Sequence, residues 1–464
     1  MRRGDVPESN LRSGRAANAA GPDSTLAYMD QASYLWVRAS GHVHGIQCTW
    51  VYRREVDHDG LRRVHDNLAH GLLGRRVEPS ALPFGRHRWV SCHELPGIDV
   101  ANPVDSRDAV TDWFDERARV PIDPEFGPCW HLGVLPIEGY GTAVTLVASH
   151  TVVDGVGTCI ALTDAVKGVR RDLRLPPPGA RPKRQALVED FRQTLRGLPE
   201  IGDALRATVT VARQNRPTKE GPGGQPSAPK PNRKDNRPAM VPGATIYIDG
   251  AEWDTRAESL GGTSNALMAG FAAKLAEKYG RLRGDGLVTL SYPINDRTEN
   301  DMRANALKGI DFPVDPRPVT SDLRKIRNDF RETINAGLGK FKEQERAFPL
   351  TPFVPTIVLR KLPLAAMNAD LTVGCSNFGE MDPAVAYVDG SEADYYGMRM
   401  VEQNLTANSP EVASGELYVA SGRVAGKLFV SFRAYHPNWD NSRQALLEKI
   451  SATLADFELT AFIE

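Results

Sequence analysis

The sequence predicts an α/β (α+β) fold built from two units, and three observations lead to this prediction. The chain has 464 residues, of which 41% are hydrophobic and 25% charged, a composition typical of a globular protein with a large core. Strand-like and helix-like periodicities alternate in both halves. A stretch rich in Pro, Gly and basic residues interrupts them. We therefore expect, in chain order, a disordered extension (1–23), an N-terminal unit (24–212), a linker (213–240) and a C-terminal unit (241–464).

The expected elements of the first unit follow from residue spacing and from signals at the ends. Residues 46–53 and 141–149 are rich in β-branched and aromatic side chains, and the second run is almost entirely apolar, as expected of a buried strand. Apolar residues at helical spacing predict helices over 56–71, 106–119 and 157–173. A serine that can cap the helix begins the second of these.

The second unit shows the same mixture of patterns. Its expected helices have apolar residues at helical spacing, and its expected strands are short runs rich in β-branched and aromatic residues. The helices are expected at 263–279, 319–341 and 441–457, and the strands at 244–248, 287–293, 371–376, 384–388, 416–421 and 427–432.

Composition also excludes several classes of protein. The 57 basic and 58 acidic residues leave no net field that would recruit nucleic acid or an anionic membrane. No apolar run is long enough to cross a bilayer, and the Arg-containing N-terminus has no apolar core of a secretory signal. The five cysteines are scattered without metal-binding spacing. With a mean hydropathy of -0.37, we expect a cytoplasmic protein, at most peripheral to a membrane, with no bound metal.

One motif contains residues that are suited to catalysis. Residues 149–155 (SHTVVDG) end the most apolar strand and precede a helix. His150 is thus placed where side chains leave the core, and its imidazole is suited to general-base work near neutral pH. Asp154 can fix the turn or bind an arginine, and Gly155 permits a backbone conformation closed to residues with a Cβ. The same pattern is also typical of a strand that ends in a capped turn and has no catalytic role.

The motif resembles the HHxxxDG motif of the CoA-dependent acyltransferase superfamily, the chloramphenicol-acetyltransferase-like fold of condensation domains, polyketide-associated acyltransferases and bacterial wax ester synthase/diacylglycerol acyltransferases. Further segments along most of the chain are similar to segments of that family. They are LAYMD (26–30), GRR (74–76), WV (89–90), SYPINDR (291–297), SNFG (376–379) and SGRVAGKLFVSF (421–432).

The resemblance implies a fold and a set of roles. It implies two chloramphenicol-acetyltransferase-like lobes in a V shape, with an active-site tunnel at their junction and His150 midway along it. It makes His150 the general base, and it makes Asp154 a structural residue in a buried, bidentate pair with Arg297. Asn377 is expected to line the tunnel and to steady the oxyanion. Ser149 stands where most members carry the first His and is also expected to line the tunnel.

The implied function is transfer of an acyl group from a CoA or carrier-protein thioester to a hydroxyl or amine. The segments similar to wax ester synthases favour a hydroxyl of a lipid or natural product. The thioester is then a co-substrate, and no cofactor is expected to be bound. Expected partners are the donor, an alcohol or amine acceptor and a carrier protein, without nucleic acid, and a monomer suffices. The alternatives are a free-standing condensation-type enzyme that forms an amide, and an inactive scaffold that lost activity with the first His.

A second histidine pattern, His42 and His44 in GHVHG, has spacing that suggests a metal site. No third ligand cluster accompanies it, and neighbouring same-face positions on a strand explain it. We therefore expect a structural role for both.

Overall fold

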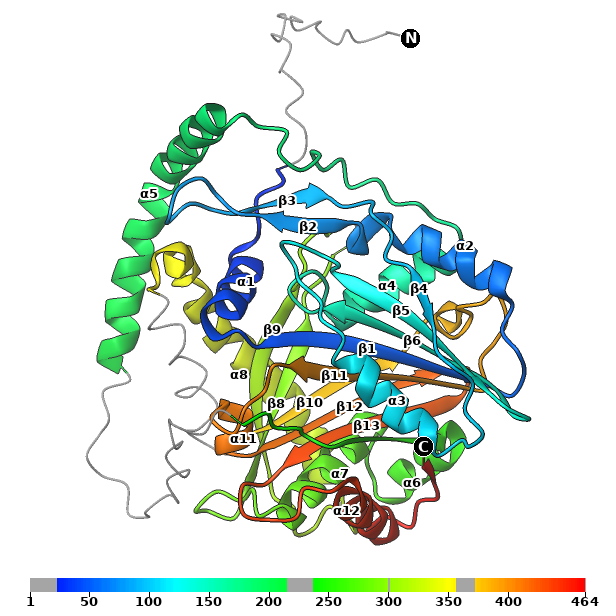
Figure 1. Cartoon of the computed structure of the whole chain (residues 1–464). Coiled ribbons are helices and arrows are strands. Elements are labelled where there is room, and N and C mark those ends of the chain that lie inside the picture. Colours follow the sequence, from blue (N-terminus) through cyan, green and yellow to red (C-terminus); the bar gives the residue numbers. More distant parts are fainter. Residues whose placement is uncertain (1–22, 215–236, 299–300, 356–371, 464) are drawn as a thin grey trace, which may run out of the picture.

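The computed structural model describes residues 23–214, 237–298, 301–355 and 372–463. It shows two sheets in two lobes, with a small hairpin beside the first (Figure 1). In order across the N-terminal sheet, the strands are β11 (Tyr395–Gln403), β1 (Val43–Tyr52), β6 (Gly141–Ser149), β5 (Trp130–Ile137) and β4 (Ile98–Val100). The hairpin consists of β2 (Arg75–Glu78) and β3 (Arg88–Ser91). The expected N-terminal extension up to residue 22 and residues 215–236 of the expected linker lie outside the described residues.

The C-terminal sheet is mixed. Strand β10 is parallel to both of its neighbours, whereas the other strand pairs of this sheet are antiparallel. In order, its strands are β14 (Phe462–Ile463), β7 (Gly243–Asp249), β13 (Lys427–Tyr435), β12 (Glu416–Val424), β10 (Val373–Glu380), β8 (Val288–Asn295) and β9 (Leu307–Val314).

Helices cover the two sheets separately. In the N-terminal lobe, α2 and α4 pack together against one core and α3 covers another, while α6, α7, α8 and α12 lie on the C-terminal sheet. The helices are α1 (Tyr28–Ser40), α2 (His58–Leu68), α3 (Ala109–Ala118), α4 (Gly155–Val166), α5 (Lys183–Gln214), α6 (Gly250–Ser259), α7 (Ser264–Lys278), α8 (Arg324–Glu345), α11 (Pro410–Ala413) and α12 (Arg443–Asp456), and the short 3-10 turns are η1 (Gly71–Leu73), η2 (Phe348–Phe353) and η3 (Pro383–Ala386).

One strand of the C-terminal half lies in the N-terminal sheet. β11 comes after the expected linker, yet it pairs with β1 along its whole length, from Val51↔Tyr395 to Val43↔Gln403. Its Tyr396 and Met398 belong to the N-terminal core. The unit predicted as 241–464 thus contributes residues 395–403 to the sheet of the other lobe.

The predicted elements differ from the observed ones mainly at their ends. Residues 384–388, expected as a strand, instead belong mainly to η3, because the Asp382 carboxylate caps the Ala384 N–H and Pro383 takes the first position of the turn. Ser106 does not cap a helix, since α3 begins at Ala109. Helix α5, which reaches residue 214 inside the expected linker, was not predicted. Over the described ranges, no helix combines the length and apolarity needed to cross a bilayer.

Candidate active site

His150 lies at the first position after β6 and faces the junction of the lobes. Its backbone N–H donates to the carbonyl of His44 (2.9 Å), and its own carbonyl accepts from Asn305 Nδ2 (3.2 Å). The backbone is therefore held on both sides. Within the described ranges the imidazole itself makes no hydrogen bond, so both ring nitrogens are free to meet a substrate.

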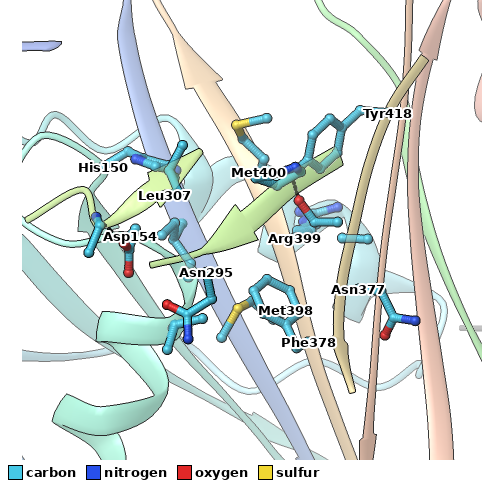
Figure 2. Close-up of a pocket in the computed structure, with 17 residues that line it drawn as sticks. His150, Asp154, Asn295, Leu307, Asn377, Phe378, Met398, Arg399, Met400 and Tyr418 are labelled. Atoms are coloured by element: carbon cyan, nitrogen blue, oxygen red, sulfur yellow. Dashed lines mark hydrogen bonds between the residues drawn. The ribbon is translucent and has the colours of Figure 1, made fainter. Parts of the chain in front are cut away.

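A cavity of about 250 Å³ opens beside the imidazole, between β1 and β11 of one lobe and β8, β10 and β12 of the other (Figure 2). Its walls are mainly apolar. The apolar side chains that line it include Ile46, Val156, Leu307, Phe378, Met398 and Met400. A concave, mostly apolar site with a few polar groups is typical of a small-molecule pocket.

Asp154 is fully engaged by the protein. Its Oδ1 accepts the Gly157 N–H (2.7 Å) and caps α4, while its Oδ2 accepts the Ala306 N–H (2.9 Å) and Arg297 Nη2 (2.9 Å). Both side chains of the ion pair are 4% exposed. The structure thus brings Asp154 and Arg297 together through one nitrogen and one oxygen. The expected bidentate geometry is wrong, because the helix cap occupies the other carboxylate oxygen.

The other terminal nitrogen of Arg297 binds backbone carbonyls. Its Nη1 donates to the carbonyls of Asp301 (3.1 Å) and Arg303 (2.8 Å), and Nη2 also reaches Ala304 (3.1 Å). Arg297 therefore fixes the connection between β8 and β9 against the turn that carries His150.

Two N-terminal residues hold the same connection from the other side. The Asp30 carboxylate accepts the N–H groups of Ala304 (2.9 Å) and Asn305 (2.8 Å), and burial raises its pKa. Arg75 donates to the carbonyls of Met302 and Val152 (2.8 Å), and burial lowers its pKa to about 10. Its guanidinium lies 4.4 Å from the ring centre of Trp89. Four segments quoted for the family resemblance thus meet at one loop.

Gly155 is needed for space, and the expectation of a special backbone conformation is wrong. Its φ is not positive, but a Cβ at this position would lie 2.4 Å from Phe378 Cε1. The glycine lets the start of α4 approach the strand that carries Phe378 across the lobe junction.

The two further residues that were expected to line the tunnel have different outcomes. Ser149 is completely buried and does not line the cavity, because successive strand residues point to opposite faces. Asn377 does line it, but its Nδ2 donates to Asn265 (2.7 Å) and its Oδ1 accepts the Gly379 N–H (2.9 Å). Figure 2 places it across the cavity from His150. The lining position expected of Asn377 is thus confirmed, and its role at the oxyanion stays a prediction, because Nδ2 carries a second hydrogen.

A pair of hydroxyls in the cavity wall was missed by sequence reasoning. Ser376 Oγ and Tyr418 Oη lie 2.6 Å apart on neighbouring strands, and both residues line the cavity (Figure 2). Burial raises the pKa of Tyr418 to about 12, so the phenol keeps its proton. One hydrogen bond joins the two oxygens, and one hydroxyl hydrogen is left over for a ligand. Ser376 was in a quoted segment, but nothing in the sequence pointed to Tyr418.

The GHVHG histidines each lie beside another polar side chain. His42 Nε2 lies 3.0 Å from Ser409 Oγ, and His44 Nε2 lies 3.3 Å from Glu402 Oε1. In the part of the chain that the structure describes, no group of three His, Cys, Asp or Glu side chains is placed to hold a metal ion.

A family-model scan and a search of curated proteins found no match. Solved structures do match. The first condensation domain of the calcium-dependent antibiotic synthetase has a TM-score of 0.56 at 13% identity, over 95% of this chain and 100% of that one. Polyketide synthase associated protein 5 from Mycobacterium tuberculosis has a TM-score of 0.50 at 15% identity, over 94% and 98%.

A larger relative shows the same unit inside a longer chain. The nonribosomal peptide synthetase FmoA3 matches at a TM-score of 0.51 and 18% identity, over 94% of this chain. This chain spans only 44% of the length of that synthetase. At these identities the likeness concerns the fold, and it confirms the fold that the sequence motifs implied: the chain has the two-lobed fold of condensation domains and of a polyketide-synthase-associated protein.

Proposed function

We propose that this protein is an acyltransferase that moves an acyl group from a CoA or carrier-protein thioester to a hydroxyl or amine. The observation that carries the proposal is the imidazole of His150, which has no protein partner in the described ranges and borders an apolar cavity at the lobe junction. An inactive scaffold would have no need of an open cavity beside this ring.

The reaction needs no covalent enzyme intermediate. His150 takes the proton of the acceptor O–H or N–H while that oxygen or nitrogen attacks the thioester carbonyl carbon. The new C–O or C–N bond forms as the carbonyl becomes an oxyanion, and the hydroxyl hydrogen left over at Ser376 and Tyr418 is a donor for that oxyanion. The C–S bond then breaks, and the thiolate takes the proton from the imidazolium.

The cavity walls support an apolar acyl or acceptor group next to the base. Met398, Met400 and Phe378 present flexible or flat apolar surface there. Met400 and Arg399 also line a second cavity of about 530 Å³. Two cavities that share these residues give the two substrates separate places to approach the junction.

The test is a thiol-release assay on the purified chain with a panel of acyl-CoAs, with and without pooled alcohols and amines. We expect acceptor-dependent release that falls about 10²–10⁴-fold in His150→Ala. The exposed His58→Gln serves as the matched control and keeps full activity. If no acyl-CoA serves, the same assay is run with acyl-phosphopantetheine thioesters on a carrier protein. Release with neither donor, or release that His150→Ala leaves intact, overturns the proposal.

A further inference from the structure

Three titratable side chains lie in a row across the N-terminal sheet. The register pairs His44 of β1 with Glu402 of β11, and it pairs Gly45 with Ser149 of β6. The next pair in that register is His44 and His150, which the 2.9 Å hydrogen bond from His150 N to His44 O confirms. Directly opposed residues of antiparallel strands put their side chains on the same face, with Cα atoms roughly 5 Å apart.

This face of the sheet is the one that borders the cavity. Ile46 and Met400 form the next same-face pair along β1 and β11, and both line the cavity beside His150. The middle member of the row is held in place. Trp36 of α1 packs against the His44 ring at 4.6 Å between centroids, and the buried Nε2 lies 3.3 Å from Glu402 Oε1.

The charges of the row are set by their neighbours. Burial alone would raise the pKa of Glu402, but the guanidinium of Arg433, 3.2 Å away, holds it below the usual value, so Glu402 is ionised. Burial lowers the pKa of His44 to about 4, which keeps His44 neutral near pH 7. The other titratable groups that act on His44 are His150, Arg433 and His42.

The carboxylate acts on the row through its charge. His44 Nε2 is buried and makes no hydrogen bond within the described ranges, although Glu402 Oε1 lies 3.3 Å away. A negative charge on the same face of the sheet favours the imidazolium that forms when His150 accepts a proton.

We propose that His44 and Glu402 are positioning residues for His150, a cross-strand row that stabilises the base in its protonated form. The proposal rests on the function proposed above. It gives His150 the support that its own ring lacks, since within the described ranges no side chain binds either of its nitrogens.

The variant Glu402→Gln removes the charge with little change in shape, and His44→Phe keeps the contact with Trp36 but loses both ring nitrogens. The control is Glu416→Gln. Arg433 Nη2 lies 3.3 Å from Glu416 and 3.2 Å from Glu402, so this control disturbs the same arginine without touching His44.

We expect kcat to fall about 10-fold in Glu402→Gln and in His44→Phe, with KM little changed. The double variant should be no slower than the slower single variant, because the pair acts as a unit. Glu416→Gln should behave as the parent protein. Equal effects of Glu402→Gln and Glu416→Gln, or additive effects of the two positioning variants, would overturn the proposal.

A second readout does not depend on turnover. With the ten histidines labelled in the ring with ¹⁵N, the signals of His150 should move in Glu402→Gln and stay in place in Glu416→Gln. Movement without any His150-dependent acyl transfer in the parent protein would leave the row standing and refute the proposed function. Acyl transfer with unmoved His150 signals would refute the row alone.

Discussion

Asp154 and His150 belong to the same turn, four residues apart, and the protein treats them in opposite ways. Asp154 accepts three hydrogen bonds from two lobes and is 3% exposed. The His150 imidazole accepts and donates none among the described residues, and it borders a cavity. A buried carboxylate with both oxygens bonded to the protein holds structure, whereas an imidazole fixed through its backbone keeps both nitrogens for chemistry. Within this turn, Asp154 thus stabilises the structure and His150 is available for the reaction.

The largest expected effect is on stability, and it comes from the ion pair of Asp154 and Arg297. In Arg297→Ala the Asp154 carboxylate stays buried without its cation, which we expect to lower the free energy of unfolding by about 3–5 kcal/mol. Urea unfolding followed by circular dichroism measures it. Arg303→Ala is the matched control on the same loop, because Arg303 is half-buried and binds neighbouring acids, and it should cost less than about 1 kcal/mol. A lost turnover with an unchanged unfolding curve in Asp154→Ala would contradict the division of roles.

A second test concerns the packing of the same turn. Gly155→Ala would bring a Cβ to 2.4 Å from Phe378, so we expect a loss of about 1–3 kcal/mol in unfolding free energy. Phe378→Leu should restore part of it in the double variant. Gly202→Ala in α5 is the control, since nothing lies within 4 Å of its Cβ, and it should raise stability by about 0.5–1 kcal/mol. A Gly155→Ala protein as stable as the parent would show that the lobe junction yields to a methyl group.

Other histidines of the N-terminal lobe resemble Asp154 more than His150. His87 Nδ1 accepts the Ser80 N–H (3.0 Å), and His131 Nδ1 lies 3.3 Å from Arg117 Nη2, a group that can only donate. Burial lowers the pKa of each to about 4. The unfolded chain, with a pKa near 6.5, therefore binds more protons than the folded one between about pH 6.5 and 4.

It follows that stability is fully present above about pH 6.5 and is lost as the pH falls towards 4. Urea unfolding at a series of pH values should show this slope, and His87→Gln should flatten it, because glutamine offers an acceptor and does not titrate. The exposed His58→Gln leaves the slope unchanged. A parent protein whose free energy of unfolding does not change over this pH range would show that protonation of these two rings does not destabilise the fold.

The sequence allowed several of the strands and helices and the motif residues to be predicted, because these depend on local signals. The run at 141–149 is apolar throughout, and Thr263 caps α7 as its side chain chemistry suggests. The partnership of Asp154 with Arg297 came from the resemblance. What could not be predicted is decided by distant segments: β11 joins a sheet built mostly from the other half, and Tyr418 meets Ser376 only after β10 and β12 pair. The row from Glu402 to His150 needs the register of three strands, which no local pattern encodes.

The smallest expected effect concerns Ser149, the residue that departs from the family motif. Its hydroxyl is buried and finds no hydrogen-bond partner within the described ranges, so Ser149→Ala removes an unsatisfied group and should change stability by less than about 1 kcal/mol. Because Ser149 points away from the cavity, turnover in the thiol-release assay should stay within about threefold of the parent value. Ser149→His is the opposing variant: it forces a ring into a filled site and should lower the unfolding free energy by about 1–3 kcal/mol. A hundredfold loss of turnover in a stable Ser149→Ala protein would instead show that this hydroxyl takes part in the reaction. The reactive part of the turn would then begin at Ser149 and not at His150.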